Sequence, residues 1–193
     1  MHRILKPTGS IYLQMDFKIN HWIRCIMDDV NFIFKNEIIW EYGLGNNNKK
    51  LNWQEKHDTI LFATKYKEYT WNDSRGEVTP QMKQKYCHKD DLGYYMMSYG
   101  KKYYLKGGKK IGNVWSLPNL SSTDNERVGY DTQKPKALIE RIIKASSNEG
   151  DLVCDFYLGS GTTCEVALEL GRRFIGCDIN PRAIEIAKER CKI

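Results

Sequence analysis

The sequence lacks several features that would assign it to a particular class of protein. None of the apolar runs in its 193 residues approaches the roughly 18 residues of a membrane-spanning helix. The first residues, MHRILKPTGS, lack the apolar core and cleavage site of an export signal. No two of its six cysteines have C-x-x-C spacing. These absences predict a cytoplasmic protein with reduced cysteines, no membrane segment and no metal site.

What the sequence contains predicts a folded, basic protein. The hydrophobic fraction is 41% and the aromatic fraction 12%, as in globular chains. The length suits one domain with an elaborated insertion. The net charge of +6 favours a polyanionic partner.

Residues 66–115 concentrate lysines and aromatic residues and have only weak periodicity, which predicts an insertion into a more regular core. The stretch YGKKYYLKGGKK, for example, contains Lys101, Lys102, Lys109 and Lys110. Lysines can neutralise phosphates and rings can pack on sugars or bases, so these residues form a candidate DNA-binding surface. The composition leaves open a solvated, irregular face with half-buried tyrosines.

The remaining sequence alternates strand-like and helix-like segments. Strands are expected at residues 8–15, 36–42, 57–65, 152–155 and 173–178, and helices at 17–30, 132–145, 162–170 and 181–190. Asn180 is the expected cap of the last helix. Because continuous apolar strands alternate with helices, we expect an α/β fold with a mostly parallel, doubly wound sheet.

The segment DFYLGSGTT, residues 155–163, has the pattern of a ligand-binding turn between a strand and a helix. Asp155 and Asp178 end consecutive strands and should lie at the carboxyl edge of the sheet. Gly159 and Gly161 let the backbone approach a ligand, and Thr162 starts the helix. An acid such as Asp178 can accept hydrogen bonds from ribose hydroxyls. The turn therefore predicts a ligand that contains ribose.

The turn alone does not identify the nucleotide. The NAD fingerprint needs a third glycine where Cys164 stands, and a phosphate-binding loop needs a lysine after the glycines. An NAD-type nucleotide and a tight turn without a ligand both remain open at this point.

A second motif, Thr-Gln-Lys-Pro at residues 132–135, opens the helix that leads into the glycine strand. Together with FYLGSGTT and RRFIGCDIN, it resembles the permuted group of amino-methylating DNA methyltransferases. LKPTGSIYLQMD, NEIIWEYG and KHDTILFATK are similar to that family's later strands. The resemblance implies a site-specific methyltransferase of the restriction-modification type that uses S-adenosylmethionine and double-stranded DNA. The expected target is adenine N6 rather than cytosine N4.

The resemblance also implies which residues bind the cofactor. Lys134 would meet the cofactor carboxylate, the glycine turn would meet its methionine end and Asp178 its ribose. The full implied set is Thr132, Gln133, Lys134, Asp155, Tyr157, Gly159, Ser160, Gly161, Thr162 and Asp178. The sequence departs from the family pattern in two places: Phe156 and Tyr157 replace Pro-Phe, and Asp131 replaces a proline.

The family's catalytic loop, an Asp, Asn or Ser followed by Pro-Pro and an aromatic residue, does not occur, because no two of the five prolines are adjacent. The resemblance therefore implies a Rossmann-like, circularly permuted and N-terminally truncated fold without a catalytic residue of its own. Residues 1–65 would form the catalytic half, 66–115 the target-recognition insertion and 128–193 the cofactor half.

In the family a strand lies between residues 152–155 and 8–15, and here it is missing. We expect that the two half-sheets close up, that water enters, or that a separate N-terminal fragment or restriction-modification subunit supplies the strand. A non-catalytic remnant that binds DNA or cofactor is the alternative function.

Overall fold

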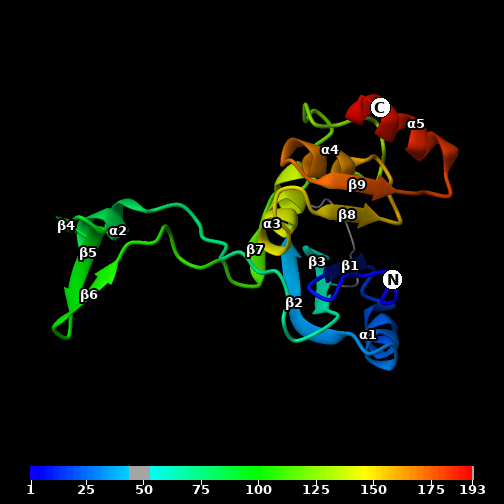
Figure 1. Ribbon diagram of the computed structural model, residues 1–193. Coiled ribbons are helices and arrows are strands. Elements are labelled where there is room, and N and C mark those ends of the chain that lie inside the picture. Colours follow the sequence, from blue (N-terminus) through cyan, green and yellow to red (C-terminus); the bar gives the residue numbers. More distant parts are fainter. Residues whose placement is uncertain (44–52, 193) are drawn as a thin grey trace. The chain divides into compact units, whose positions relative to one another are not determined.

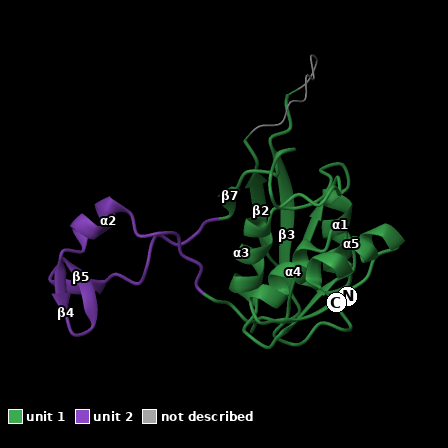
Figure 2. Cartoon of the chain, turned by 90° about the horizontal axis from the view of Figure 1, so that it is seen from above, with its two compact units in different colours: residues 1–72, 113–193 green, residues 73–112 purple. Residues whose placement is uncertain are grey.

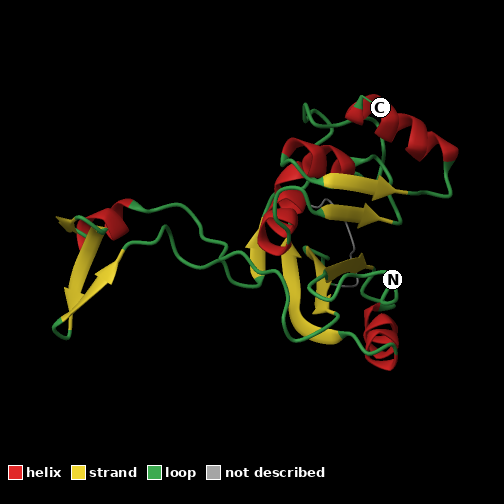
Figure 3. Cartoon of the chain, viewed as in Figure 1, coloured by secondary structure: helices red, strands yellow, loops and turns green. Residues whose placement is uncertain are grey.

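The computed structural model describes residues 1–43 and 53–192. The chain divides into two compact units, residues 1–72 with 113–193, and residues 73–112 (Figure 2). The smaller unit falls within the range predicted as an insertion. No helix of the described part of the chain (Figure 3) is both long enough and apolar enough to cross a membrane.

The larger unit contains a four-stranded sheet with the order β1-β3-β2-β7 (Figure 1). Its strands are β1 (Ser10–Met15), β2 (Ile33–Glu41), β3 (His57–Thr64) and β7 (Val114–Ser116). β3 is antiparallel to both β1 and β2, so β1 and β2 run in the same direction. Helix α1 (Asn20–Asp29) connects them, and β7 pairs with β2 in parallel.

The expectation of a mostly parallel sheet is wrong for this part of the molecule. It relied on the continuous apolar run in HDTILFAT, which is typical of parallel strands. The structure gives another reason for the run: all six residues from Thr59 to Thr64 are buried. On one face, Leu61 and Ala63 pack with Met27 and Phe32 near α1. The apolar run therefore indicates that β3 is buried on both faces, and it does not indicate the direction of the strand.

A second sheet contains β8 (Leu152–Asp155) and β9 (Arg173–Gly176), which are parallel. Helix α4 (Thr162–Glu169) connects them, and α5 (Pro181–Cys191) follows β9. This strand-helix-strand-helix order is the α/β pattern that the sequence predicts.

Helix α3 (Lys136–Ser146) lies beside both sheets of the larger unit. Its Ile143 packs against Val166 and Ala167 of α4 in the core of the second sheet. Its last residue, Ser146, is hydrogen-bonded through Oγ to the Tyr12 hydroxyl on β1, at 2.6 Å. The helix therefore connects the two sheets.

The smaller unit, residues 73–112, is built around a three-stranded antiparallel sheet with the order β4-β5-β6. Its elements are α2 (Pro80–Lys85), β4 (His88–Asp90), β5 (Gly93–Ser98) and β6 (Lys101–Tyr104). Where the chain enters and leaves the unit, the two segments touch: a Cβ on Gly108 would lie 2.1 Å from the Gly76 carbonyl oxygen. Only glycine fits at that crossing.

Two asparagines, Asn72 and Asn113, lie at the points where the chain leaves and re-enters the larger unit, and both are hydrogen-bonded within that unit. The Asn72 backbone N–H donates to the Ala145 carbonyl at 2.7 Å, and its side chain donates to the Ser147 carbonyl at 2.9 Å. Asn113 donates through its side chain to the Glu37 carbonyl, also at 2.9 Å. Both junctions are therefore fixed to the larger unit.

Candidate cofactor site

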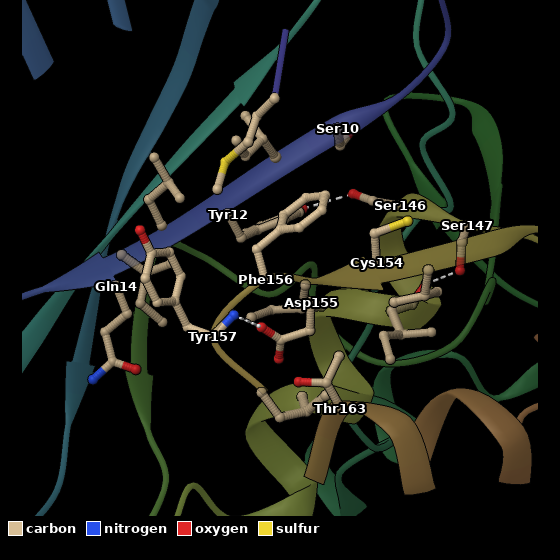
Figure 4. A pocket seen from close by; sticks show the side chains of 18 of the residues that line it. Ser10, Tyr12, Gln14, Ser146, Ser147, Cys154, Asp155, Phe156, Tyr157 and Thr163 are labelled. Carbon is tan, nitrogen blue, oxygen red and sulfur yellow. Dashed lines mark hydrogen bonds between the residues drawn. The ribbon is translucent and has the colours of Figure 1, made fainter. Parts of the chain in front are cut away.

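A cavity of about 910 Å³ is lined by every residue of β1 and β8 and by part of the glycine turn (Figure 4). Its size is near the upper end of ordinary ligand pockets. The predicted cofactor residues that line it are Thr132, Lys134, Asp155, Tyr157, Gly159, Ser160 and Thr162. Gln133, Gly161 and Asp178 are not in its wall.

Gly161 has a structural reason to be glycine that the sequence pattern does not reveal. Its φ is +74°, which side chains rarely adopt, and a Cβ there would lie 2.7 Å from the Ala187 Cβ on α5. Gly159 also has a positive φ, +53°, but its nearest neighbour would be 3.5 Å away, at Tyr130. The second glycine therefore allows α5 to pack directly behind the turn.

Arg190 on α5 holds the turn from behind, and the sequence analysis missed it. Its Nη1 donates to the Thr162 hydroxyl at 3.0 Å and to the Ser160 carbonyl at 3.3 Å. Its Nε pairs with Glu165, and the Arg190 side chain is only 6% exposed. An arginine at helical spacing from the buried Ala183 and Ala187 is the signal that could have identified it.

The two predicted acids at the strand ends both accept backbone hydrogen bonds. Asp178 accepts from the Asn180 N–H at 2.9 Å and from the Gly159 N–H at 2.8 Å, and these bonds lower the pKa of its carboxyl group. Asp155 accepts from the Tyr157 N–H at 3.0 Å. Both carboxylates therefore fix the backbone of the turn, whether or not they also contact a ligand.

The Thr-Gln-Lys-Pro segment is a turn that precedes α3, because α3 begins at Lys136 and not at the predicted Thr132. The Gln133 side chain is buried and points into the preceding loop. It donates to the Glu126 carbonyl at 2.6 Å and accepts from the Val128 N–H at 2.9 Å. Gln133 therefore holds the turn and leaves the neighbouring Lys134 to line the cavity.

Lys134 lies beside the glycine turn, because the Thr162 hydroxyl donates to the Lys134 backbone carbonyl at 3.2 Å. Burial lowers the pKa of the Lys134 ammonium group, and the nearby Asp58 opposes that shift. Its Nζ lies 5.8 Å from the centre of the Trp40 ring. Lys134 therefore combines a partly desolvated charge with a position beside the turn.

Asp58 lines the cavity and was also not predicted from the sequence. It accepts from the Gln14 side chain at 2.5 Å and from the Tyr42 hydroxyl at 3.1 Å. Burial, followed by the charge of Asp58, raises the pKa of Tyr42 to about 12. An acid within the otherwise apolar run HDTILFAT was the available signal, although its partners on β1 and β2 are distant in sequence.

The charges of the cavity wall suit a ligand that has both a carboxylate and a cationic centre. Lys134 offers an ammonium group, while Asp58, Asp155 and Asp16 line the same wall. Across residues 1–43 and 53–192, no three His, Cys, Asp or Glu side chains are grouped so that they could hold a metal ion.

The four predicted DNA-binding lysines are all exposed in the unit of residues 73–112. Lys102 pairs with Asp90 at 2.6 Å, and Lys110 lies 3.6 Å from Asp73. Lys101 and Lys109 make no ion pair with any residue that the structure describes. The four lysines therefore differ in how freely each could meet a phosphate.

The fold and the cavity define an α/β protein with a glycine turn after the first strand of a parallel pair. The DNA methylase family N6_N4_Mtase matches residues 1–189, and the chain belongs to this family. The predicted resemblance is confirmed by this match.

Curated relatives are longer than this chain. The type II methyltransferase M.HpaI of Haemophilus parainfluenzae is 39% identical over 98% of the chain, which covers 55% of that relative. The DNA adenine methyltransferase YhdJ of Escherichia coli (strain K12) is 33% identical over the whole chain, which covers 63% of it. The chain thus spans about half to two thirds of these relatives.

Solved structures share the fold. The crystal structure of the M1.HpyAVI–SAM complex has a TM-score of 0.71 at 22% identity. The match covers 97% of this chain and 76% of the chain in that structure. The cytosine-N4-specific PvuII DNA methyltransferase has a TM-score of 0.67 at 18% identity, over 96% of this chain and 64% of that one. At such identities the likeness shows the α/β fold alone.

Proposed function

We propose that this chain is the cofactor-binding and DNA-recognising part of a site-specific DNA methyltransferase that transfers a methyl group from S-adenosylmethionine to adenine N6. The observation that carries the proposal is that Lys134, Asp155 and the glycine turn meet at one cavity in a member of the DNA methylase family.

The residues present fit S-adenosylmethionine. Its carboxylate would meet Lys134, whose desolvated ammonium group gains most from a negative partner. Its sulfonium and amino groups carry positive charge, which the acids of the wall suit. Asp178 would accept the ribose hydroxyls, although it lies outside the cavity wall and already accepts two backbone N–H groups. When bound, the cofactor supplies the methyl group.

An NAD-type nucleotide fits the same residues less well. It presents a pyrophosphate, which would meet the acids of the wall rather than a cluster of backbone N–H groups and cations. The acids and the match to the DNA methylase family both favour S-adenosylmethionine.

The circular permutation is part of the proposal. The turn and its strands β8 and β9 follow the four-stranded sheet in the chain, which supports the order expected for the permuted group. A Pro-Pro loop would have to come from outside residues 1–193, where the longer relatives have additional sequence. Such a loop would accept the hydrogens of the target amino group and direct its lone pair at the methyl carbon.

Adenine is the proposed target because YhdJ, a curated relative at 33% identity, is named a DNA adenine methyltransferase. The cytosine-specific PvuII enzyme is a structural likeness at only 18% identity. DNA methylated by the chain together with a polypeptide that supplies the Pro-Pro loop would be digested to nucleosides, and mass spectrometry would distinguish N6-methyladenine from N4-methylcytosine.

The unit of residues 73–112 is the proposed DNA-recognition region. Its exposed lysines stand among exposed rings, of which Tyr99 is 98% exposed at the turn after β5. Lysines and rings together can contact phosphates and bases.

The test separates cofactor binding from methyl transfer. Calorimetry should show that the chain binds S-adenosylmethionine and that excess NAD does not compete. Methyl transfer to unmethylated DNA should be undetectable with the chain alone, since the Pro-Pro loop is not in it. Binding of NAD but not S-adenosylmethionine would overturn the proposal.

The second candidate function is a module that binds DNA and cofactor without methyl transfer. The absence of adjacent prolines from residues 1–193 favours it. It predicts cofactor binding and DNA binding that persist while no partner polypeptide restores methylation.

A further inference from the structure

The outer half of the hairpin formed by β5 and β6 is a two-stranded ribbon. β4 pairs only with residues 93–95 of β5, whereas β6 pairs with residues 95–98. Residues 96–103 therefore have no third strand beside them within their unit. The turn that ends this ribbon lies at the end of the sheet away from α2 (Figure 1). A two-stranded ribbon is narrow enough to enter the major groove of duplex DNA.

Tyr99 and Gly100 form the turn at the tip of the ribbon, because Ser98 pairs with Lys101. Both turn residues have a positive φ, +48° for Tyr99 and +72° for Gly100. Two-residue hairpin turns of this kind favour glycine, asparagine or aspartate, which adopt the left-handed conformation more readily than other residues. A tyrosine is strained there, so the backbone of the turn does not explain why one occupies the tip.

The other described non-glycine residues with a positive φ have a local reason for it. They are Asn31 and Lys192, and each follows the end of a helix. The Asn31 N–H donates to the Asp28 carbonyl at 2.9 Å, and the Lys192 N–H donates to the Glu189 carbonyl at 3.3 Å. Both residues therefore close the last turn of a helix, which Tyr99 does not do.

The Tyr99 side chain does not contribute to the packing of its unit. The side chains of His88, Tyr95 and Tyr104 contact one another, with ring centroids 5.4 and 5.6 Å apart. Tyr99 is instead 98% exposed, and its side chain has no ring contact or hydrogen bond within residues 73–112. A ring that is both strained and exposed is best explained by a contact with another molecule.

The two turns of this sheet differ in charge. The turn between β4 and β5 follows Asp90 and contains Asp91 and Leu92, of which Leu92 is 79% exposed. The turn of Tyr99 is followed by Lys101, which is exposed and has no ion pair within residues 73–112. The end of the sheet that carries the strained ring is therefore the basic end, which suits a polyanion.

We propose that the ribbon enters duplex DNA and that the Tyr99 ring stacks on a base in an opened base step, while Lys101 contacts a neighbouring phosphate. The proposal rests on the proposed function, in which residues 73–112 bind DNA, and adds which residue enters the duplex. DNA-binding proteins that kink a duplex commonly insert a side chain between base pairs. Methylation of a base also requires that the base leave the stack, so an opened step accompanies the proposed reaction.

Tyr99→Asn gives the first test, because asparagine accepts the left-handed turn more readily than tyrosine. The variant should be at least as stable to denaturant as the unaltered chain. We expect it to bind a mixed-sequence duplex at least about fivefold more weakly, through the loss of one stacking contact. Fluorescence anisotropy measures the affinity. An unchanged affinity of Tyr99→Asn would overturn the proposal.

The salt dependence of binding separates stacking from charge. Stacking releases no counterions, so Tyr99→Asn should leave the slope of log affinity against log salt unchanged. Lys101→Gln should make this slope less steep by about 0.9, the value for one phosphate contact. If Tyr99→Asn changes the slope as Lys101→Gln does, the ring acts by positioning the lysine, and the stacking role is wrong.

Two control variants isolate the aromatic ring. Tyr99→Phe removes the hydroxyl but keeps the ring, and should keep the affinity within about twofold. Leu92→Asn removes an exposed apolar side chain from the other turn of the same sheet, and should leave the affinity unchanged. Equal losses in Leu92→Asn and Tyr99→Asn would show a general effect of exposed apolar surface and would contradict the proposal.

A duplex with one central abasic site tests the stacking directly. The missing base leaves a gap that a ring can fill at little unstacking cost. The unaltered chain should bind this duplex at least about fivefold more tightly than the intact one, whereas Tyr99→Asn should bind both equally. If the unaltered chain does not distinguish the two duplexes, its ring stays outside the base stack and the proposal fails.

These readouts separate the role of Tyr99 from the proposed function. If every variant binds DNA as the unaltered chain does, residues 73–112 remain the DNA-recognition region and the stacking role is overturned. If Tyr99 stacks in a chain that does not bind S-adenosylmethionine, the stacking role stands and the methyltransferase is overturned. A chain that binds neither duplex overturns both.

Discussion

The glycine turn and the unit of residues 73–112 are both proposed binding regions, but they are built in opposite ways. Around the turn, Ser160 and Thr162 are each only 4% exposed, and Arg190 bonds to both. In residues 73–112, the lysines are exposed and at most paired with single acids. The turn offers one fixed geometry, whereas the basic unit offers charge. The comparison teaches that the two proposed ligands, an invariant cofactor and a variable DNA sequence, would each be matched by the kind of site that the structure provides.

The largest effect that would test the fixed geometry of the turn is expected from Gly161→Ala. A Cβ there meets Ala187 at 2.7 Å and has to adopt φ +74°. The variant should lose about 2–5 kcal/mol of unfolding free energy, together with cofactor binding. Gly129→Ala is the control, because its φ is +73° and nothing lies within 4 Å. Denaturant titration that gives equal losses for both would show that α5 does not constrain the turn.

Arg190→Met tests whether the turn depends on support from behind. The change removes one of the two cations beside Glu165, which keeps Lys136 at 3.3 Å, and takes the Arg190 donor away from the Ser160 carbonyl. We expect a loss of about 2–4 kcal/mol of stability, and a weaker affinity for S-adenosylmethionine measured by calorimetry. Lys188→Met removes an exposed charge from the same helical turn and should change neither quantity. Unchanged cofactor affinity in Arg190→Met would contradict the positioning role.

Lys134→Gln tests the positive charge in the cavity wall beside the glycine turn. Loss of a charged hydrogen bond of about 1.5–3 kcal/mol should weaken S-adenosylmethionine binding roughly 10- to 100-fold. In the unaltered chain, burial lowers the pKa of Lys134, and only the protonated form attracts a carboxylate. Affinity should therefore fall as the pH rises through that lowered pKa, and Lys134→Gln should abolish this dependence. A pH-independent affinity in both proteins would exclude Lys134 from the site.

The smallest effect concerns the basic unit and compares two pairs of lysines. Lys101 and Lys109 lack ion pairs among the described residues, whereas Lys102 and Lys110 have acidic neighbours. Replacing the first pair by glutamine should make the slope of log affinity against log salt less steep by about 1.8, at roughly 0.9 per phosphate contact. Replacing the second pair should change the slope less. The slopes are measured by fluorescence anisotropy with duplex DNA. If both double variants have the same slope as the unaltered chain, this region is only a solvated surface.

Local sequence signals predicted the elements around the turn well. The strand at residues 152–155 has the predicted bounds, and Asn180 caps α5 by accepting from the Arg182 N–H at 3.1 Å. Strand propensity, glycines and caps act over a few residues, so a sequence contains them directly. The family resemblance then joined these local signals into one site.

Features that depend on distant residues were not predictable in the same way. The direction of β3 depends on its neighbours and not on its composition. Asp58 gains its role from Gln14 and Tyr42, which lie on other strands. Gln133 was expected to assist at the cofactor, yet its side chain bonds to the loop before it. In each case tertiary contacts decide what the residue does.

The two asparagines that end the larger unit have an evolutionary consequence. Asn72 and Asn113 attach the chain to the larger unit just before and just after residues 73–112, through bonds to Ala145 of α3 and Glu37 of β2. We therefore expect that residues 73–112 can be replaced without disturbing the glycine turn. The pair marks the two points at which the proposed DNA-recognition unit could be exchanged, by recombination or by design, for the corresponding segment of a relative.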